Sequence, residues 1–526
     1  MSFRVCIPTA GTGSRLGLLT RYLNKSLVNV GGRPALAHII EQFPTDVEFV
    51  IPLGFKGNLV KEFLDLAYPD RTFFYTHVDP YEGAGSGLGL TLLSVKEHLR
   101  LPFIFISCDT LVKEPIPAPE DNWMGYTNNL ELDISAYRTL ELNEQRVIKV
   151  CEKQEGTNSR HKPYIGLAGI YDHQAFWLKM EHGGSEAIRI GEVFGFKALL
   201  EPCLKAHAFT WYDTGSPAAL AIARAEFTEP DTPNILEKKN EAIWFVDHQV
   251  IKFSNDQSFI RNRARRVKYL EGFIPEITGV RDNMYAYRKV HGRVLSEIAT
   301  LPLFEKLLAH SQTFWSKVPS NHPEAAVLAS RCRCFYRDKT YSRIELFYKN
   351  YDHRDGTECI NGEAMPSLTS LLDAIDWDCL SNAVPVRFHG DFHFENILFD
   401  ADSERFYFLD WRQEFAGNLE IGDIYYDLAK LLHGLIISHE IIARDLYTVS
   451  WNRDAASIDF HRKQILVECE QFFLAWLSNN GLDPRKVGIL TALVYLNIAG
   501  LHHRPYSFLL FFLGKQKLKR HLEARQ

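Results

Sequence analysis

Short apolar segments alternate with amphipathic ones through the first part of the chain. The apolar segments have the length and composition of buried strands, and the amphipathic segments repeat their hydrophobic residues at helical spacing. A strand–helix–strand–helix–strand order of this kind predicts an α/β domain with a Rossmann-like, mostly parallel sheet. The expected strands are residues 3–9, 47–54 and 103–109, and the expected helices are residues 33–43 and 58–68.

The pattern changes after residue 240. Residues 242–254 form two short apolar runs around a tight polar connection, which is typical of two paired strands, and residues 259–273 have helical periodicity. Residues 284–292 predict a further strand, and helical periodicity dominates from about residue 300 onward. This order predicts an α+β, kinase-like domain. Its small sheet lobe would span about residues 236–300, and its large helical lobe about residues 300–526.

A charged segment, EFTEPDTPNILEKKN at residues 226–240, separates the two patterns. It contains two prolines and follows a helical run, so it has the character of a linker. We therefore predict two domains, residues 1–228 and residues 236–526.

The composition narrows the class of protein. Of the 526 residues, 46% are hydrophobic and 24% are charged, as in ordinary globular proteins, and the net charge of −6 argues against a general nucleic-acid binder. No apolar run reaches the roughly 20 residues that span a bilayer, and the N-terminus has no signal-peptide pattern. We expect a cytoplasmic protein that binds small-molecule substrates, binds no nucleic acid and has no membrane span. A homo-oligomeric state is left open.

A glycine-containing loop follows the first expected strand. Gly11, Thr12 and Gly13 lie where backbone N–H groups can approach phosphate oxygens, although a tight turn without a ligand would have the same sequence. Arg15 and Lys25 follow, and two fixed cations beside backbone donors suit a nucleoside triphosphate.

Two aspartates occupy strand ends in the same domain. Asp109 ends the apolar run FIFISCD, and Asp213 lies in WYDTGSP between an apolar run and the start of a helix. A carboxylate at the end of a buried strand must be solvated, paired or metal-bound, and two together can hold Mg²⁺ across a triphosphate. The alternative for Asp213 is an N-cap role for the following helix.

With these motifs in this order, about the first 225 residues resemble the sugar-1-phosphate nucleotidyltransferase family. The resemblance implies that Arg15 and Lys25 hold the triphosphate, that Asp109 and Asp213 bind Mg²⁺, and that Gly87 lines the base pocket. Glu152 and Lys153 would bind the second substrate, Glu152 at a hydroxyl or amine and Lys153 at the phosphate. The nucleotide is CTP or another NTP. The sequence departs from the family at Asn24, where a proline usually precedes the loop lysine. The residues that carry the resemblance are Gly11, Gly13, Arg15, Lys25, Asp109, Glu152, Lys153 and Asp213.

A second set of motifs lies in the C-terminal part. In HGDFHFEN, Asp391 and Asn396 have the spacing of a catalytic aspartate and a metal-binding asparagine in kinases, and Asp410 ends the next apolar run. Asp391 would deprotonate a substrate hydroxyl, Asn396 and Asp410 would hold Mg²⁺ on ATP, and Lys252 would neutralise the non-transferred phosphates. The helical run at 259–270 offers no clear glutamate to pair with Lys252.

The HGD…N…DW variant and the segment GDIYYDLAKLLHG resemble the aminoglycoside phosphotransferase and choline kinase family, over roughly residues 235–500. Together with the first resemblance, this implies a bifunctional kinase and nucleotidyltransferase. It would phosphorylate a sugar or amino-alcohol with ATP and convert the monoester into an NDP-activated precursor for surface polysaccharide. Two alternatives stay open: synthesis of CDP-choline or CDP-ethanolamine, and a degenerate nucleotide-binding domain that regulates the other.

Overall fold

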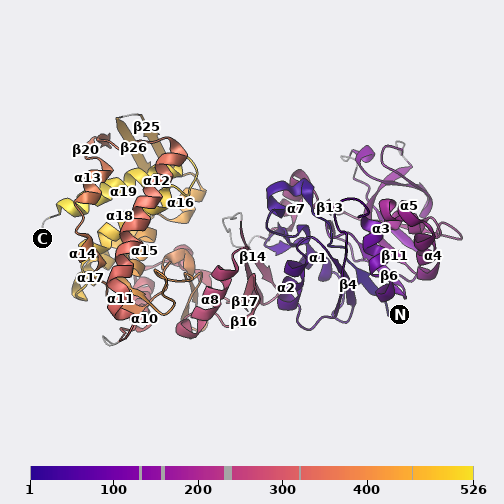
Figure 1. The fold of residues 1–526 in the computed structure, drawn as a ribbon, viewed down its shortest axis with the longest axis horizontal. Helices are drawn as coiled ribbons and strands as arrows, with labels where there is room; N and C mark the ends of the chain where they lie inside the picture. Colours follow the sequence, from indigo (N-terminus) through magenta and orange to yellow (C-terminus); the bar gives the residue numbers. More distant parts are fainter. Residues whose placement is uncertain are drawn as a thin grey trace. The chain divides into compact units, whose positions relative to one another are not determined.

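The computed structural model describes residues 2–129, 133–155, 160–229, 240–318, 322–452 and 454–524. They form two compact units (Figure 1). The first comprises Met1–Ile260 with Ile277–Arg288, and the second comprises Arg261–Glu276 with Lys289–Gln526. The strands between residues 240 and 288 belong to the first unit. The predicted division, with a second domain beginning at residue 236, assigns them to the second domain. The described helices include none that is long and apolar enough to cross a membrane.

The first unit is built on a nine-stranded sheet in the order β5-β4-β1-β6-β11-β8-β12-β10-β9. The strands from β5 to β6 run parallel, as expected. Strand β11, however, is antiparallel to both β6 and β8, so the sheet is mixed and the expectation of a mostly parallel sheet is wrong for its second half. In chain order, the strands are β1 (Arg4–Cys6), β4 (Glu48–Leu53), β5 (Phe73–His77), β6 (Phe103–Ile106), β8 (Trp123–Tyr126), β9 (Thr139–Asn143), β10 (Arg146–Cys151), β11 (His161–Ile170) and β12 (Lys205–Ala208).

Helices cover both faces of this sheet (Figure 1). Alternate residues of β1 and β6 enter two different cores: Val5 and Ile104 pack with α1 and α2, whereas Cys6 and Phe105 pack with α3 to α6. Two buried faces explain why these strands are uninterrupted apolar runs. The helices are α1 (Ala35–Ile40), α2 (Gly57–Ala67), α3 (Leu88–Ser94), α4 (His173–His182), α5 (Gly184–Ile190), α6 (Glu192–Phe196) and α7 (Pro217–Phe227).

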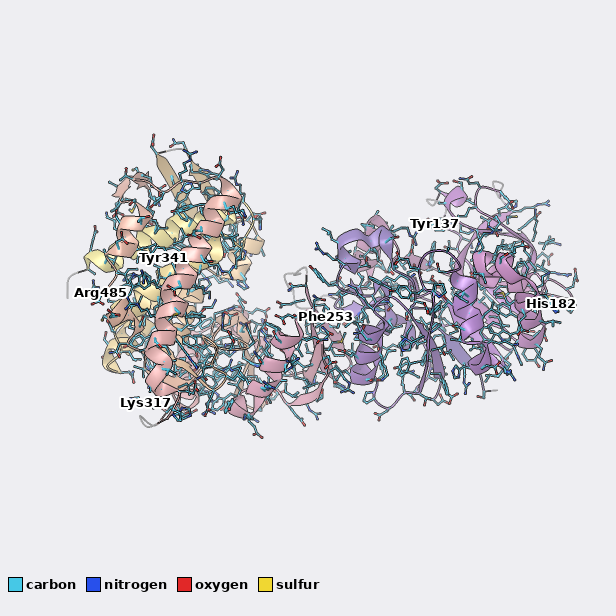
Figure 2. All side chains as sticks on the ribbon, viewed as in Figure 1. Tyr137, His182, Phe253, Lys317, Tyr341 and Arg485 are labelled. Carbon is cyan, nitrogen blue, oxygen red and sulfur yellow. The ribbon has the colours of Figure 1, made fainter. Side chains whose placement is uncertain are left out.

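A four-stranded antiparallel sheet, ordered β14-β15-β17-β16, completes the first unit. Its buried residues join the core that contains α2, and the rings of Phe63 and Trp244 meet edge to face with centroids 5.3 Å apart. Phe253, labelled in Figure 2, belongs to the same core and is 2% exposed. The sheet predicted as a kinase small lobe therefore shares its hydrophobic core with the α/β domain. Its strands are β14 (Glu241–Val246), β15 (Gln249–Ser254), β16 (Ile277–Val280) and β17 (Met284–Arg288).

The second unit is mainly helical, with small sheets whose strands flank the segment of residues 389–396. Strand β21 (Pro385–Arg387) pairs with β24 (Ile421–Asp423), and β22 (Ile397–Asp400) pairs with β23 (Arg405–Phe408). A π-helical turn, η5 (Cys334–Asp338), continues directly into α12. The helices are α8 (Gln257–Leu270), which starts in the first unit, α9 (Leu295–Ile298), α10 (Leu301–Phe314), α11 (Ala325–Arg333), α12 (Lys339–Tyr351), α13 (Leu368–Asp373), α14 (Trp377–Ser381), α15 (Ile424–Ile436), α16 (His439–Ala443), α17 (Gln464–Asn479), α18 (Pro484–Ala499) and α19 (Tyr506–Glu523).

Candidate active sites

The loop after β1 turns through a left-handed glycine. Gly13 has φ 66°, and a Cβ at this position would lie 2.7 Å from Cβ of Lys25. Glycine adopts this positive φ without strain, and its lack of a Cβ avoids the close contact with Lys25. Gly11, two residues earlier, is exposed with open space around it, which leaves its backbone accessible.

Asp109 lies directly after β6, between two cations. Its Oδ2 is 3.1 Å from Lys25 Nζ and 3.9 Å from Arg15 Nη2, and its Oδ1 accepts a hydrogen bond of 2.5 Å from Ser107 Oγ. Burial opposes ionisation of Asp109, but Lys25, the Ser107 hydroxyl and Arg15 outweigh it and lower its pKa. The same attraction raises the pKa of Lys25 against the effect of burial. Both groups are therefore charged.

Asp213 lies close to Asp109, although it belongs to a different strand. β13 (Trp211–Asp213) pairs with β7 (Thr110–Val112) and sets Asp213 opposite Thr110. A Cβ placed on Gly215 would lie 2.8 Å from Arg15 Nη2 and 2.9 Å from both Asp109 Oδ2 and Asp213 Oδ1. The three side chains thus converge over a glycine.

The charge and hydrogen bonds of Asp213 differ from those of a capping residue. Burial and the nearby Asp109 charge raise its pKa, whereas the Gly215 N–H donates to its Oδ1 at 2.7 Å and opposes the rise. The N-cap of α7 is Ser216, whose hydroxyl accepts from the Ala219 N–H, so Asp213 does not have the alternative capping role. Asp109 and Asp213 bring two carboxylates close together. Such a pair can supply the oxygen ligands that a hard cation such as Mg²⁺ prefers.

Asn24 fixes the lysine loop. Its side-chain amide donates to the carbonyl oxygens of Thr9 at 2.9 Å and Phe55 at 2.6 Å, and its Oδ1 accepts from the backbone and hydroxyl of Ser26 at 2.9 and 2.8 Å. Its φ of −70° lies in the range that proline adopts. Asn24 stands where the family usually has a proline. Its buried side chain ties the lysine loop to two neighbouring segments.

The predicted Glu152 and Lys153 follow β10. Glu152 accepts a hydrogen bond of 3.0 Å from Arg138 Nε, and Lys153 is exposed. Tyr137, next to Arg138 in the chain, packs its ring against Trp211 with centroids 5.4 Å apart (Figure 2). Burial and the Asp213 charge raise the pKa of Tyr137.

Tyr137 and Arg138 therefore link the Glu152 segment to the carboxylate site, a role that no sequence motif indicated. Gly87 has a packing role in addition to its predicted one, because a Cβ there would meet the Ile188 carbonyl oxygen at 2.5 Å.

A buried carboxylate, Glu192, lies behind Glu152 and was also missed. It is 4% exposed, and burial raises its pKa to about 7 even though the Arg138 charge opposes the rise. The Glu152 charge adds to the increase. Glu192 therefore retains its proton to much higher pH than an ordinary glutamate and is about half protonated near pH 7.

Among the described residues, one trio of potential metal ligands lies apart from the predicted sites. Donor atoms of Glu141, Cys151 and His161 come within 4.8 Å of one another on β9, β10 and β11. The registers of these three neighbouring strands account for their proximity.

In the second unit, a buried aspartate on α15 holds the predicted catalytic loop, residues 389–396. Asp427 accepts from the backbone N–H groups of His389 at 2.7 Å and Gly390 at 2.6 Å, and from Trp315 Nε1 at 3.0 Å. Burial raises the pKa of Asp427 to about 6 against these donors. Arg266 on α8 supports the loop by donating to the Phe388 carbonyl.

His389 has a structural place in this loop. Its Nδ1 accepts from the Asp391 N–H at 3.2 Å, so its Nε2 carries the proton and donates to the Leu409 carbonyl at 2.8 Å. Burial lowers the pKa of His389 to about 3 and keeps the ring neutral.

Asp391 is contacted on both carboxylate oxygens. Lys430 Nζ lies 2.7 Å from Oδ1, and Asn396 Nδ2 donates to Oδ2 at 3.1 Å. Burial would raise the pKa of Asp391, but Lys430 and His393 hold it well below its usual range. The predicted pair Asp391 and Asn396 is therefore in direct contact, with Lys430 as an unpredicted third member.

Asp410 follows β23 in a left-handed conformation, with φ 57°. The Leu409 N–H donates to the Asn396 carbonyl at 2.7 Å, which holds Asp410 and Asn396 on neighbouring segments. Arg263 on α8 forms an ion pair with Asp410. Lys252 lies on β15 in the first unit, opposite Ile243 and Tyr285, and its role toward ATP stays a prediction.

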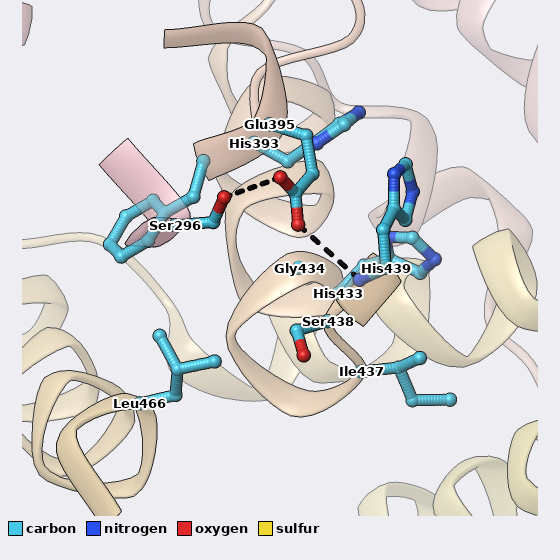
Figure 3. A pocket seen from close by; sticks show the side chains of 10 residues that line it. Ser296, His393, Glu395, His433, Gly434, Ile437, Ser438, His439 and Leu466 are labelled. Atoms are coloured by element: carbon cyan, nitrogen blue, oxygen red, sulfur yellow. Dashed lines mark hydrogen bonds between the residues drawn. The ribbon is translucent and has the colours of Figure 1, made fainter. Parts of the chain in front are cut away.

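A small enclosed cavity of about 10 Å³ lies beside the catalytic loop (Figure 3). Glu395 crosses it, accepting from the Ser296 hydroxyl and from the His439 N–H at 3.3 Å. His393 and His433 also line it, and burial holds the pKa of His433 well below its ordinary value. The cavity has room for about one water molecule and offers no space for a substrate.

Comparisons with known proteins agree with both resemblances. Residues 329–460 match the phosphotransferase enzyme family. A bifunctional GlmU protein of Methanococcus vannielii is 23% identical over 240 residues, which are 43% of this chain and 55% of that protein. The UTP–glucose-1-phosphate uridylyltransferase AglF of Haloferax volcanii is 30% identical over 105 residues, which are 19% of this chain and 41% of that protein. A solved UDP-glucose pyrophosphorylase of Acinetobacter baumannii superposes with TM-score 0.38 and 13% identity, over 44% of this chain and 96% of that one.

The chain therefore combines a segment that matches the phosphotransferase enzyme family with an N-terminal half that is similar in sequence to sugar-1-phosphate nucleotidyltransferases. The chain spans about half the length of these two curated relatives, 55% and 41%.

Proposed function

We propose that the chain is bifunctional. The C-terminal part phosphorylates a small hydroxyl compound with ATP, and the N-terminal part transfers a nucleotidyl group from CTP or another NTP to the resulting monoester and releases pyrophosphate. The observation that carries this proposal is that one chain holds two separate constellations of charged groups, Asp109 and Asp213 with two cations, and Asp391 with Asn396 and Lys430.

In the nucleotidyltransferase site, Arg15 and Lys25 bind the triphosphate. The carboxylates of Asp109 and Asp213 fit Mg²⁺, which neutralises phosphate charge when bound. Lys153 holds the phosphate of the second substrate, and Glu152, oriented by Arg138, binds its hydroxyl or amine. The monoester oxygen forms a bond to the α-phosphorus, the bond between the α-phosphorus and the bridging oxygen breaks, and pyrophosphate leaves. Positioning and charge neutralisation supply the rate enhancement.

In the kinase site, Asp391 accepts the proton of the acceptor hydroxyl as its oxygen bonds to the γ-phosphorus, and ADP leaves. Asn396 and Asp410 fit a second Mg²⁺ because both offer oxygen ligands beside the catalytic aspartate. Lys252 would neutralise the non-transferred phosphates.

The two activities form a sequence because a kinase makes a phosphate monoester and a nucleotidyltransferase consumes one. The product is an NDP-activated compound of the kind that polysaccharide synthesis consumes. The close approach of Asp109 and Asp213, and of Asp391 and Asn396, favours two active domains over a degenerate regulatory one.

A coupled screen tests this function. Protein is supplied with Mg²⁺, ATP, one further NTP and a panel of sugars, hydroxy acids and amino-alcohols, and the release of ADP and pyrophosphate is followed. Asp391→Asn should abolish both signals, and Asp109→Asn should abolish only pyrophosphate release. Pyrophosphate release that requires a monoester unrelated to any kinase product would refute the sequential reading.

A further inference from the structure

Basic side chains from three elements gather around the catalytic aspartate of the kinase site. Lys430 comes from α15 and lies 2.7 Å from Asp391 Oδ1. Lys339 is the first residue of α12, and Arg412 follows the Asp410 segment. Lys339 Nζ lies 4.2 Å, and Arg412 Cζ 5.0 Å, from the ring centroid of Phe335, so one aromatic side chain brings these two cations together.

The backbone fixes Arg412 beside the predicted catalytic loop, and Lys339 follows a π-helical turn. Arg412 N–H donates to the His389 carbonyl at 2.9 Å, and a Cβ on Gly390 would lie 2.6 Å from Cβ of Arg412. Phe335 and Lys339 lie in and just after the π-helical turn η5. Such turns occur preferentially at functional sites because they change which side chains face inward.

The charges in this cluster do not balance. Burial lowers the pKa of Lys339 to about 6, and the charges of Arg412, Arg343 and Lys430 add to that effect. Asp391 offsets them only in part. An anion placed among these groups would relieve the repulsion and keep Lys339 protonated.

The two oxygens of Asp391 separate this cluster from the metal-binding residues. Oδ2 is contacted by Asn396, which belongs to the predicted metal set, whereas Oδ1 is contacted by Lys430. Lys430 therefore contacts a different oxygen of Asp391 from the predicted metal-binding asparagine, so an acceptor held by Lys430 would approach Oδ1.

We propose that the kinase acceptor is an anion, a hydroxy compound that carries a carboxylate or a phosphate, held by Lys339, Arg412 and Lys430. This inference rests on the proposed kinase function and names its substrate class. The acceptor's hydroxyl oxygen bonds to the γ-phosphorus, its proton passes to Asp391, and ADP leaves.

A quaternary ammonium compound fits this site poorly. Choline would meet several like charges, the one partly exposed aromatic ring named above, Phe335, already faces two cations, and the tryptophan and tyrosines nearby are buried. Trp411 is 1% exposed and donates its indole N–H to the Arg263 carbonyl at 3.2 Å, and Tyr425 and Tyr426 are each 8% exposed.

Matched pairs of acceptors test the proposal. Initial rates of ADP release are measured with glycerate against glycerol, galacturonate against galactose and glucuronate against glucose, with choline as the cation. An acid should exceed its neutral partner by about 100-fold in kcat/KM, because a charged hydrogen bond left unmade costs about 3 kcal/mol. Equal use of the neutral partner, or a preference for choline, would overturn the proposal.

Variants separate acceptor binding from ATP binding. Lys339→Met and Arg412→Met should each raise the KM for the acid about 10-fold or more and leave the KM for ATP unchanged, and Lys339→Arg should restore most of the affinity. Lys349→Met, an exposed lysine on the same helix, is the matched control. A rise in the KM for ATP alone would assign the cluster to the nucleotide instead. Thermal unfolding of each variant shows whether it is folded.

Titration calorimetry with MgATP distinguishes failure of this inference from failure of the proposed function. If wild type binds MgATP and no acid in the panel is bound or phosphorylated, the acceptor class is wrong and the kinase assignment stands. If MgATP itself does not bind, the kinase function fails and the inference fails with it.

Discussion

Lys430 Nζ and Asp391 Oδ1 form an ion pair of 2.7 Å beside the contact of 3.1 Å between Asn396 and the other carboxylate oxygen. A carboxylate held on both oxygens keeps a fixed orientation toward an approaching hydroxyl. Lys430 is therefore a positioning residue for the phosphoryl transfer proposed here.

Replacing Lys430 by methionine should lower the turnover number for ADP release about 100-fold, since misplacing a catalytic group costs about that factor. Pyrophosphate release from a monoester supplied directly should not change. Lys306→Met, at a lysine that is 60% exposed on α10, is the control. Unchanged ADP turnover in Lys430→Met would show that the pair has no role in orienting Asp391.

Asn24→Ala removes the hydrogen bonds that tie the lysine loop to Thr9 and Phe55. We expect the free energy of unfolding to fall by about 3 kcal/mol, because buried partners are left unsatisfied, and pyrophosphate-release turnover to fall with it. Urea denaturation and steady-state rates give the two quantities. Asn58→Ala on the exposed surface of α2 should match wild type, and an Asn24→Ala protein as stable and active as this control would contradict the assigned role.

Glu192 makes the stability of the first unit depend on pH. Its pKa is raised to about 7, so between about pH 4.5 and 7 the folded state retains a proton that the unfolded chain releases. Stability should therefore fall as pH rises through this window, by at most about 1.4 kcal/mol per pH unit.

Glu192→Gln stays neutral and should remove this slope. The variant is expected to be more stable than wild type at pH 8, by up to about 3 kcal/mol, and nearly equal to it at pH 4.5. Urea unfolding at several pH values measures the difference, with the exposed Glu186→Gln on α5 as control. Identical slopes in wild type and Glu192→Gln would mean that Glu192 ionises normally.

Trp244 should contribute to the stability of the nucleotidyltransferase, although it lies beyond the predicted domain boundary. Its ring is fully buried against Phe63 of α2, so Trp244→Ala should cost about 3–5 kcal/mol. Pyrophosphate-release activity should then be lost at a lower urea concentration than in wild type. Ile222→Ala, at a residue 65% exposed on α7, should have little effect. Loss of ADP release alone in Trp244→Ala would contradict the shared core.

The parts of the fold and sites that follow local sequence rules were predictable. Strand ends are marked by the transition from apolar to polar residues, and parallel strands bring their carboxyl ends together, so Asp109 could be placed beside the Gly13 loop. The antiparallel insertion of β11 could not be foreseen, because strand pairing depends on contacts between segments far apart in the chain and not on the apolar pattern.

The unpredicted site residues share one property. Tyr137 and Lys339 lie in no motif, and Lys430 and Arg412 lie in or beside quoted motifs that assign them no role; Tyr137, Lys339 and Lys430 come near the sites because segments that are distant in sequence pack together. By contrast, the contact between Asp391 and Asn396 could be predicted from the sequence. The two residues are five positions apart in one short loop, which keeps them close together.

The fate of the γ-phosphate of ATP tests the two-step account most directly. With [γ-³²P]ATP, an accepted hydroxyl compound and the matching NTP, the account predicts that the label appears in the nucleotide-linked product, in the phosphate next to the acceptor. Asp109→Asn should accumulate labelled monoester without that product, and Asp391→Asn should give neither. A nucleotide-linked product that forms without the label would contradict the account, because its phosphate would not have come from the kinase step.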